Sequence, residues 1–410
     1  MHQRIAQQML LMLYLLLSYT GVQGEKKLSK LGDGELEKQI NFLNKPAVKT
    51  VKTKYGDIYD CVDFYKQRAF DHQLLKDHNF HPKMKPTLSR IKKNSSAPST
   101  SKWFSSIWSK DGGCPFGTIP VRRITKDDII RLRHMPPPED VTFNTESYVS
   151  NNHSEPKGRY ISSQGYMVAI ARTPTDRHNK FTGGGMTTSL HNPHVEGQQH
   201  SACRLKIQRG SNILQVGWRV DPTLYGDTKT RLFIHFQVGK TYCFNTLCPG
   251  FVQVNNRIPL DLSFNDTISQ PGEEPWEVNM YIEQDVANGN WWLLMTKSFV
   301  KVGFWPQKLF TGLQRFATNV EWGGVVYSPP GVPTPPMGSG NFPIENTSHD
   351  SYCVRITVSD EKGERKEVYN SITLQTDNPT MYKVVYVPLS HGSERYYFVL
   401  YGGPGESAHV

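Results

Sequence analysis

The sequence predicts an all-β protein, in which an antiparallel β-sandwich forms the main domain, carries one short helix and follows a small mixed N-terminal domain. The length of 410 residues is enough for two or three domains with a buried core. After Gly158, short alternating or aromatic runs recur between Gly, Pro, Asn and Asp. Before residue 145, charged residues and helical spacing dominate instead.

Residues 1–24 have the pattern of a secretory signal. Arg4 supplies a positive charge, Met9–Leu17 is an apolar run of nine residues, and small residues precede Glu25. A short anchor helix is the alternative, but the run is shorter than the roughly 20 residues that span a bilayer. We therefore expect cleavage before Glu25, secretion, and no membrane segment in the mature chain.

Two further features agree with secretion. Four N-x-S/T sequons lie in polar stretches, at Asn94, Asn152, Asn265 and Asn346. The six cysteines are even in number, which favours disulfides over the alternative of six buried thiols. No Cys/His pair has zinc spacing, so we expect neither a metal site nor a cofactor.

The first predicted elements are a helix and an extended segment. Leu36–Lys45 has rough helical spacing, and Cys114–Pro120 is expected to be extended. Residues 94–101 (NSSAPSTS) predict a linker between them.

A second helix is predicted from its capping residues. Thr125 is the expected N-cap, Asp128 lies at the third helical position, and the helix runs through Arg133. Met135–Asp140 (MPPPED) ends it, and residues 141–157 are polar. We place a domain boundary there, between an N-terminal part over 25–145 and a main domain over 158–410.

Nine runs predict the strands of the main domain. They are Ile213–Val220, Thr230–Val238, Gly250–Ile258, Trp276–Ile282, Trp291–Thr296, Val300–Trp305, Tyr352–Val358, Tyr382–Val387 and Arg395–Tyr401. Gln307–Asn319 has the spacing of the one short helix.

The charge distribution argues against nucleic-acid binding. The formal net charge is +10, but residues 25–150 hold 23 Lys and Arg against 15 Asp and Glu, while residues 151–410 hold 23 against 22. A nucleic-acid binder concentrates its positive charge on the folded binding module, whereas here the larger part is nearly neutral.

Common catalytic and phosphate-binding motifs are missing from the sequence. Gly183-Gly184-Gly185 lacks the spacing of a phosphate loop and is expected to be a flexible turn. His191, His194 and His200 lie within ten residues, but no carboxylate pattern accompanies them, so we expect surface histidines.

Many ordered strings resemble the plant neprosin family over nearly all of the chain after residue 24. In the first part they are Tyr59 to Gln67 (YDCVDFYKQ), Ala69 to His72 (AFDH) and Cys114 to Arg122 (CPFGTIPVR). In the second part they are Gly217 to Val220 (GWRV), Leu224 to Phe233 (LYGDTKTRLF), Asn245 to Gln253 (NTLCPGFVQ), Gly289 to Trp292 (GNWW), Val302 to Pro306 (VGFWP), Val320 to Gly324 (VEWGG), Met337 to Gly340 (MGSG) and Tyr401 to Gly405 (YGGPG).

The resemblance implies a secreted plant protein, in the extracellular space or cell wall, with a small mixed pro-domain and a β-sandwich peptidase domain. The family's characterised activity is a glutamic endopeptidase that cleaves after proline in acid. One ionised carboxyl activates water, and a second, protonated carboxyl polarises the scissile carbonyl and protonates the leaving amine.

Both carboxyl positions of the family differ here. The first Glu, two residues before Gly-Trp, is Gln215, and the second, after Trp-Gly-Gly, is Val325. Glutamine cannot transfer a proton, and valine has no polar atom. Glu321 is a weak replacement candidate, since four residues along a strand amount to about 13 Å. Trp218, Trp322, Gly323 and Gly324 are expected to line the cleft.

The resemblance also implies where the cysteines pair and where the pro-segment docks. Cys243 should pair with Cys248, and Cys61 with Cys114, which leaves Cys203 and Cys353 for a bridge outside the family pattern. Residues 55–135 are expected to cover the surface near Trp218, Trp322 and Gly323, by shape and a few ion pairs.

Three functions follow as hypotheses. The lost carboxyl pair favours a catalytically impaired, extracellular binding module for proline-containing peptides or a cell-wall polymer. The alternatives are an active acid endopeptidase that cleaves after proline and a structural extracellular glycoprotein. Two carboxyl groups facing each other across the cleft would favour the active enzyme.

Overall fold

The computed structural model describes residues 33–87, 108, 112–139, 165–369, 371–391 and 394–406. Several predicted features lie outside these residues: the signal, the 94–101 linker, the polar stretch 141–157, and the sequons at Asn94 and Asn152. Where the structure describes the chain, no helix is long and apolar enough to cross a bilayer.

The N-terminal part is small and mixed, as expected. Helix α2 (Asp33–Leu43) precedes a three-stranded antiparallel sheet of β1 (Ala47–Lys52), β2 (Ile58–Asp63) and β3 (Thr118–Arg122). Three 3-10 turns follow β2, at Phe64–Lys66, Arg68–Asp71 and Gln73–Leu75. Helix α4 (Lys126–Leu132) begins at the predicted N-cap, where Thr125 and Asp128 form a capping box.

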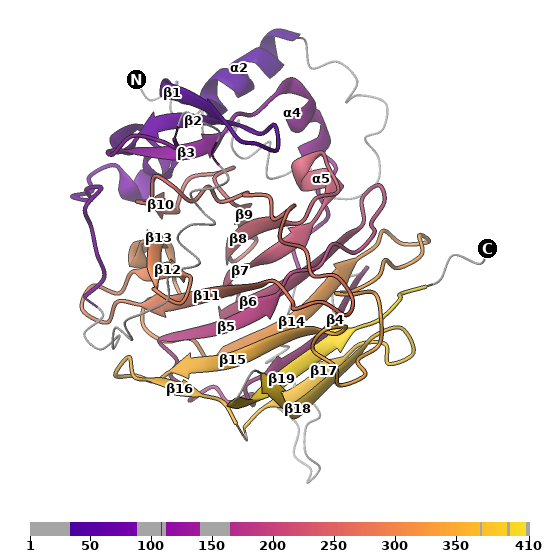
Figure 1. Cartoon of the computed structure of the whole chain (residues 1–410). Coiled ribbons are helices and arrows are strands. Elements are labelled where there is room, and N and C mark those ends of the chain that lie inside the picture. Colours follow the sequence, from indigo (N-terminus) through magenta and orange to yellow (C-terminus); the bar gives the residue numbers. More distant parts are fainter. Residues whose placement is uncertain are drawn as a thin grey trace, which may run out of the picture.

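The main domain contains two antiparallel sheets that pack face to face (Figure 1). The nine-stranded sheet has the order β10-β13-β12-β11-β5-β15-β19-β18, with β16 paired to β15. Its strands are β5 (Gly183–Ser189), β10 (Val252–Gln253), β11 (Glu277–Gln284), β12 (Trp291–Met295), β13 (Val300–Trp305), β15 (Ser351–Ser359), β16 (Arg365–Glu367), β18 (Lys383–His391) and β19 (Glu394–Gly402).

The seven-stranded sheet has the order β17-β4-β14-β6-β7-β8-β9. Its strands are β4 (Tyr166–Arg172), β6 (His200–Arg209), β7 (Asn212–Val220), β8 (Arg231–Val238), β9 (Thr241–Phe244), β14 (Asn319–Tyr327) and β17 (Thr373–Thr376). The short helix α5 (Pro222–Tyr225) follows β7, with Asp221 as N-cap and Pro222 at its first position. All nine runs predicted as strands contain strands of these two sheets.

The core lies between the sheets and contains several tryptophans. Trp218 on β7 and Trp322 on β14 are fully buried, and their indole N–H groups donate to the carbonyls of Ser189 and Gly185 on β5, at 2.9 and 3.0 Å. These bonds join the two sheets through side chains whose apolar rings fill the space between them. The expectation that Trp218 and Trp322 line a cleft is therefore wrong.

The three consecutive glycines are not a turn but the first half of β5, buried within the nine-stranded sheet. A Cβ on Gly183 would lie 2.4 Å from the Glu283 carboxylate, and one on Gly185 would lie 2.2 Å from the Tyr281 ring. At these two positions the side chains of Glu283 and Tyr281, from the paired strand β11, lie against the backbone of β5. Glycine is required there for close approach, a reason that the sequence pattern does not reveal.

The helix expected over Gln307–Asn319 is also wrong, since only Gln307–Leu309 is helical, as one 3-10 turn. The side-chain amide of Asn212 accepts hydrogen bonds from the backbone N–H groups of Thr311 and Gly312, both at 3.1 Å. The Trp291 indole donates to the Leu313 carbonyl at 2.7 Å. These partners replace the helical hydrogen bonds, so the loop buries its apolar side chains without forming a helix.

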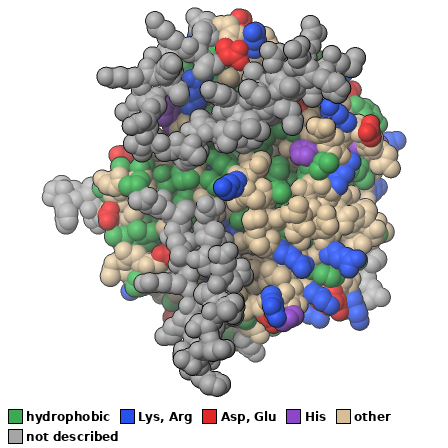
Figure 2. All heavy atoms as spheres, turned by 180° about the vertical axis from the view of Figure 1, so that it is seen from behind, with side chains coloured by type: hydrophobic (Ala, Val, Ile, Leu, Met, Phe, Trp, Pro, Cys, Tyr) green, Lys and Arg blue, Asp and Glu red, His purple; other side chains and the backbone are tan. Residues whose placement is uncertain are grey.

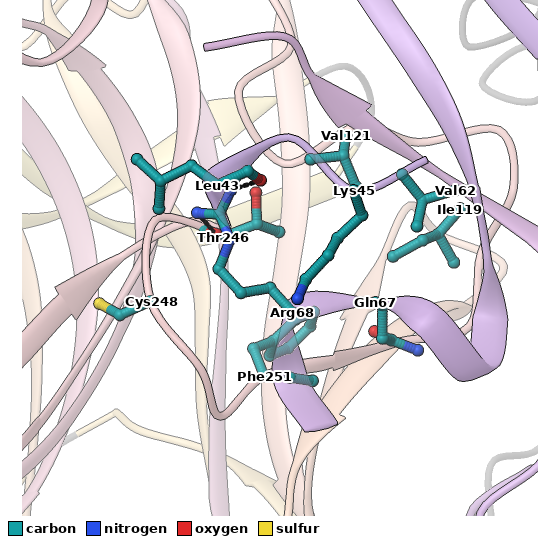
Figure 3. Close-up of a pocket in the computed structure, with 11 residues that line it drawn as sticks. Leu43, Lys45, Val62, Gln67, Arg68, Ile119, Val121, Thr246, Cys248 and Phe251 are labelled. Carbon is teal, nitrogen blue, oxygen red and sulfur yellow. Dashed lines mark hydrogen bonds between the residues drawn. The ribbon is translucent and has the colours of Figure 1, made fainter. Parts of the chain in front are cut away.

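The N-terminal part packs against the β8 and β10 side of the main domain. Tyr59 donates to Asp261 at 2.9 Å, and the fully buried Arg231 pairs with Asp57 at 2.8 Å. Arg68 enters a small pocket at this interface (Figure 3), where its guanidinium donates to the carbonyls of Leu43 and Thr246. Desolvation lowers the pKa of Arg68 to about 10. Arg68 lines this pocket, which is part of the interface.

Two of the three cysteine pairings are present as disulfides, Cys61–Cys114 and Cys243–Cys248. Cys203 on β6 and Cys353 on β15 face each other across the core as buried thiols, with sulfurs 3.5 Å apart. Asn265 and Asn346 are exposed in turns. Seen from behind, the molecule carries Lys and Arg side chains singly or in small groups rather than as one continuous basic stripe over the described surface (Figure 2).

Candidate functional site

The candidate site lies on the outer face of the seven-stranded sheet, where four adjacent strands place polar side chains in one row. The register pairs Lys206 with Glu321 on one side and with Gln215 on the other. Gln215 is in turn paired with His235 on β8. Residues two positions along a strand share a face. Arg204, two residues before Lys206 on β6, therefore lies on the same face and is paired with Gly323 on β14.

Two cations form the floor of the site. Arg204 and Lys206 are fully buried on β6, the strand between β14 and β7. Glu321 Oε2 lies 3.2 Å from Arg204 Nη2 and 3.5 Å from Lys206 Nζ. Asn319 donates to the second oxygen of Glu321 at 2.9 Å. Glu321 is thus held as a buried ion-pair partner in the middle of the sheet.

The second carboxylate of the cluster comes from the N-terminal part of the chain. Glu139 follows the three prolines after α4, and its carboxylate receives a two-pronged contact from Arg204, with Nε at 3.1 Å from Oε2 and Nη2 on Oε1. Lys206 Nζ lies 3.4 Å from Oε1, and the amide of Gln215 donates to Oε2 at 3.4 Å. Glu139 thereby neutralises the second cation of the floor.

The cations determine the ionisation of Glu139. Burial alone would raise the pKa of this carboxyl, but Arg204 and Lys206 outweigh burial and bring the pKa to about 2. Beside it, desolvation lowers the pKa of His235 to about 3, so this imidazole is neutral. The cluster around Lys206 therefore contains the cations Arg204 and Lys206, the carboxyl groups of Glu139 and Glu321, and a neutral histidine, and Arg172 on β4 is the register partner of Glu321 on its other side.

The prolines before Glu139 are held by two tyrosines. Tyr166 donates to the carbonyl of Pro137 at 2.8 Å, and Tyr242 donates to the carbonyl of Pro136 at 3.4 Å. The segment Met135–Glu139, which we call the proline strap, therefore lies across the outer face of the seven-stranded sheet. It covers Gln215, which is 5% exposed.

Val325 lies on the same face as Glu321 but in a different environment. Its neighbours form an apolar cluster of Tyr166, Val168, Ile170, Ala202, Phe233 and Tyr327. The register pairs Val325 with Ala202 and Ala202 with Arg219, so Val325 and Gln215 lie two strands and four positions apart. Glu321, by contrast, lies in the same cross-strand row as Gln215, with only Lys206 between them. As a partner for Gln215 it is therefore better placed than its position in the sequence suggests.

Gly323 and Gly324, both expected to line a cleft, lie on opposite faces of the sheet. A Cβ on Gly323 would lie 2.5 Å from the Ala169 carbonyl, and its φ of +133° also requires glycine. A Cβ on Gly324 would lie 2.4 Å from Met337 Sδ. Gly323 thus allows β14 to approach β4 closely, whereas Gly324 belongs to the core.

Residues 55–135 do pack on the main domain, as expected, but they do not cover the expected surface near Trp218, Trp322 and Gly323. Those residues pack mainly at the β8 and β10 side, and the strap that covers the site begins only at Met135. Glu139 was therefore missed. In the sequence, Glu139 stands out only as an acidic residue directly after three prolines. Its cationic partners stand out because Arg204 and Lys206 alternate with the apolar Leu205 and Ile207, which predicts two cations on one face of a strand.

The three neighbouring histidines are not all on the surface. His194 is exposed beside Glu196, but His191 and His200 are buried. Burial lowers the pKa of His191 to about 4, and its Nε2 lies 3.0 Å from Ser189 Oγ. Over the described residues, no group of three or more His, Cys, Asp or Glu side chains is arranged to hold a metal ion.

Comparisons with solved structures find distant similarities. Two structures of scytalido-glutamic peptidase, one with a transition-state analogue inhibitor and one with a peptide-based transition-state analogue, are each 10% identical, with TM-scores of 0.32 and 0.29. SCP-B, a member of the eqolisin family of peptidases in complex with the tripeptide Ala-Ile-His, is 10% identical with a TM-score of 0.28. Each match covers 58% of this chain and 98% of the other chain. These values are too low to transfer the role of any residue.

Comparison with sequence families is more direct. The model of the neprosin activation peptide matches residues 50–172, which include the proline strap and β4. The neprosin domain model matches residues 197–404, which include β6, β7 and β14. The chain therefore belongs to the neprosin family.

Proposed function

We propose that this protein is a secreted peptide-binding member of the neprosin family whose peptidase activity is impaired. The scaffold is that of a peptidase family, and one observation carries the proposal. Gln215, which the family resemblance assigns to the first carboxyl position, faces the cations of the site, and its amide hydrogen bonds to a carboxylate that is already ionised. Hydrolysis by two carboxyls needs one that donates a proton; the Gln215 amide has no such proton, and the cations keep the neighbouring Glu139 ionised.

The ion pairs add to this argument. Glu139 and Glu321 both contact Arg204 and Lys206, so two carboxylates do come together at the site. Cations at this distance stabilise the charged form of a carboxyl. The pair is therefore suited to holding a segment in place rather than to exchanging a proton with a substrate.

One observation favours an active acid endopeptidase as a second candidate. Glu321 and Gln215 share a row on the same face, separated only by Lys206. A carboxylate can activate water, and a glutamine amide can donate a hydrogen bond to a developing oxyanion. In that mechanism, Glu321→Gln would abolish cleavage.

A cleavage assay distinguishes the two candidates. The full chain, the Glu139→Gln variant with its weakened strap, and the Gln215→Glu/Val325→Glu variant are compared on a proline-containing peptide between about pH 2 and 5, which brackets ordinary carboxyl pKa values. We expect no cleavage by the first two, because loss of each acid or base costs about 10² to 10⁴ in rate. Cleavage that Glu321→Gln abolishes would establish the second candidate instead.

A further inference from the structure

The contacts of the proline strap describe the ligand that the site accepts. Every hydrogen bond or ion pair described above between the sheet and the strap has its donor on the sheet. The donors are the two tyrosine hydroxyls, the Gln215 amide and the two cations. In these contacts the strap contributes the acceptors, namely two prolyl carbonyls and one carboxylate.

This one-sided arrangement fits a proline-rich chain. Proline has no backbone N–H, so a run of prolines offers carbonyl acceptors and no donors. A peptide with free N–H groups would bring donors to a surface that presents donors. The site therefore matches an extended segment of successive prolines.

The charges add a second requirement. With the strap in place, Arg204 and Lys206 are balanced by Glu139 and Glu321. Without Glu139, Arg204 and Lys206 both lose a carboxylate that contacts them, and removing one partner of a buried charge pair is costly. A ligand that replaces the strap restores the balance only if it brings a negative charge to the same place.

The spacing of this charge is set by the strap. The two tyrosines hold the carbonyls of Pro136 and Pro137, and the fork of Arg204 holds the side chain two residues after Pro137. Guanidinium and carboxylate form two parallel hydrogen bonds, which fix direction as well as charge.

We propose that Arg204 and Lys206 form a carboxylate-recognition site, and that the ligand of the protein is an acidic, proline-rich peptide with the spacing Pro-Pro-X-Glu. The chain's own strap occupies this site as an internal copy of that ligand. The inference rests on the proposed function, because it names the peptide that the binding site selects.

The test varies the ligand and keeps the protein constant. Full-length Glu139→Gln protein, in which the strap has lost its carboxylate, is titrated by calorimetry with three capped peptides: Met-Pro-Pro-Pro-Glu-amide and its Gln and Lys counterparts. We expect the Glu peptide to bind about tenfold or more tightly than the Gln peptide, because hydrogen bonds to charged groups are the strong class, and the Lys peptide to bind most weakly. The wild-type chain should bind the Glu peptide more weakly than the variant does, because its own strap competes at high effective concentration.

Matched protein variants locate the preference. Lys206→Met removes a cation of the floor and should reduce the preference for the Glu peptide, with folding checked by circular dichroism. Arg209→Gln, at the exposed end of the same strand, should leave the preference unchanged. Equal binding of the Glu and Gln peptides, or binding of neither, would overturn the inference. Preferential binding followed by cleavage would support it while refuting the proposed loss of activity.

Discussion

Replacing Glu139 with glutamine should weaken the attachment of the strap by an amount that depends on pH. The cations lower the pKa of Glu139 from 4.5 to about 2, which corresponds to about 3 kcal/mol of stability at neutral pH. A carboxyl with a lowered pKa stabilises the folded state above its unfolded pKa, and this contribution is lost as the pH falls through the folded pKa. The penalty of Glu139→Gln should therefore be full at pH 7, begin to shrink below about pH 4.5 and vanish near pH 2.

The measurement is the free energy of unfolding in urea, followed by tryptophan fluorescence at several pH values between 7 and 2.5. Glu361→Gln is the matched control, because Glu361 pairs with Lys180 on the surface, where both side chains are more than half exposed. Surface pairs contribute little, so the control should stay close to wild type throughout. An equal loss in both variants, or a Glu139→Gln penalty that does not change with pH, would refute the ion-pair argument.

Two further predictions concern the core. Gly185→Ala should destabilise the protein by about 1–3 kcal/mol, because the added Cβ would overlap the Tyr281 ring on the neighbouring strand. Gly34→Ala is the control and should not destabilise it, because no atom lies within 4 Å of its added Cβ. Thermal unfolding compares the two variants, and equal melting temperatures would contradict the close approach at Gly185. Protein secreted into an oxidising compartment should carry a Cys203–Cys353 bridge, because the two sulfurs face each other at 3.5 Å. The intact mass should then be lower by two hydrogens than that of a chain with only the other two disulfides. Two thiols that react after denaturation would exclude the bridge.

The architecture was predictable because it depends on periodicity. Alternating aromatic runs separated by turn residues are typical of antiparallel strands, and the capping residues of α4 define its beginning in the sequence itself. β5 was missed because its glycines look like a turn. Only the pairing with β11, which places Tyr281 over Gly185, shows why a strand lacks side chains there.

The candidate site was predictable only in part, because it depends on register and on contacts distant in sequence. Strand patterns do not show that Lys206 lies between Gln215 and Glu321, since this needs the pairing of three strands. The contact between Glu139 and Arg204 joins residues 65 apart and follows no local spacing. The tryptophans were assigned to a cleft from their sequence motifs, whereas alternation along their strands places them in the core.

The two positions that the sequence resemblance assigns to the family's carboxyls, 215 and 325, have opposite electrostatic environments in this chain. Position 215 lies beside the buried cations Arg204 and Lys206, which favour an ionised carboxyl. Position 325 lies in an apolar cluster, and the cation two strands away in its row, Arg219, is already paired with Asp221 at 2.6 Å. We therefore predict that a carboxyl would ionise readily at position 215 and resist ionisation at position 325, the asymmetry that separates a general base from a general acid.

A carboxyl placed at position 325 tests this asymmetry directly. In Val325→Glu, burial should raise the pKa of the new carboxyl, so the ionised form destabilises the fold at pH 7 and protonation relieves the penalty as the pH falls through the raised pKa. Val332→Glu is the control, because Val332 is 42% exposed and a glutamate there stays in water. The gap in melting temperature between the two variants should narrow from pH 7 to pH 5. A gap that stays constant or widens on acidification would mean that nearby cations govern position 325 as well, and that the scaffold no longer separates an acid from a base.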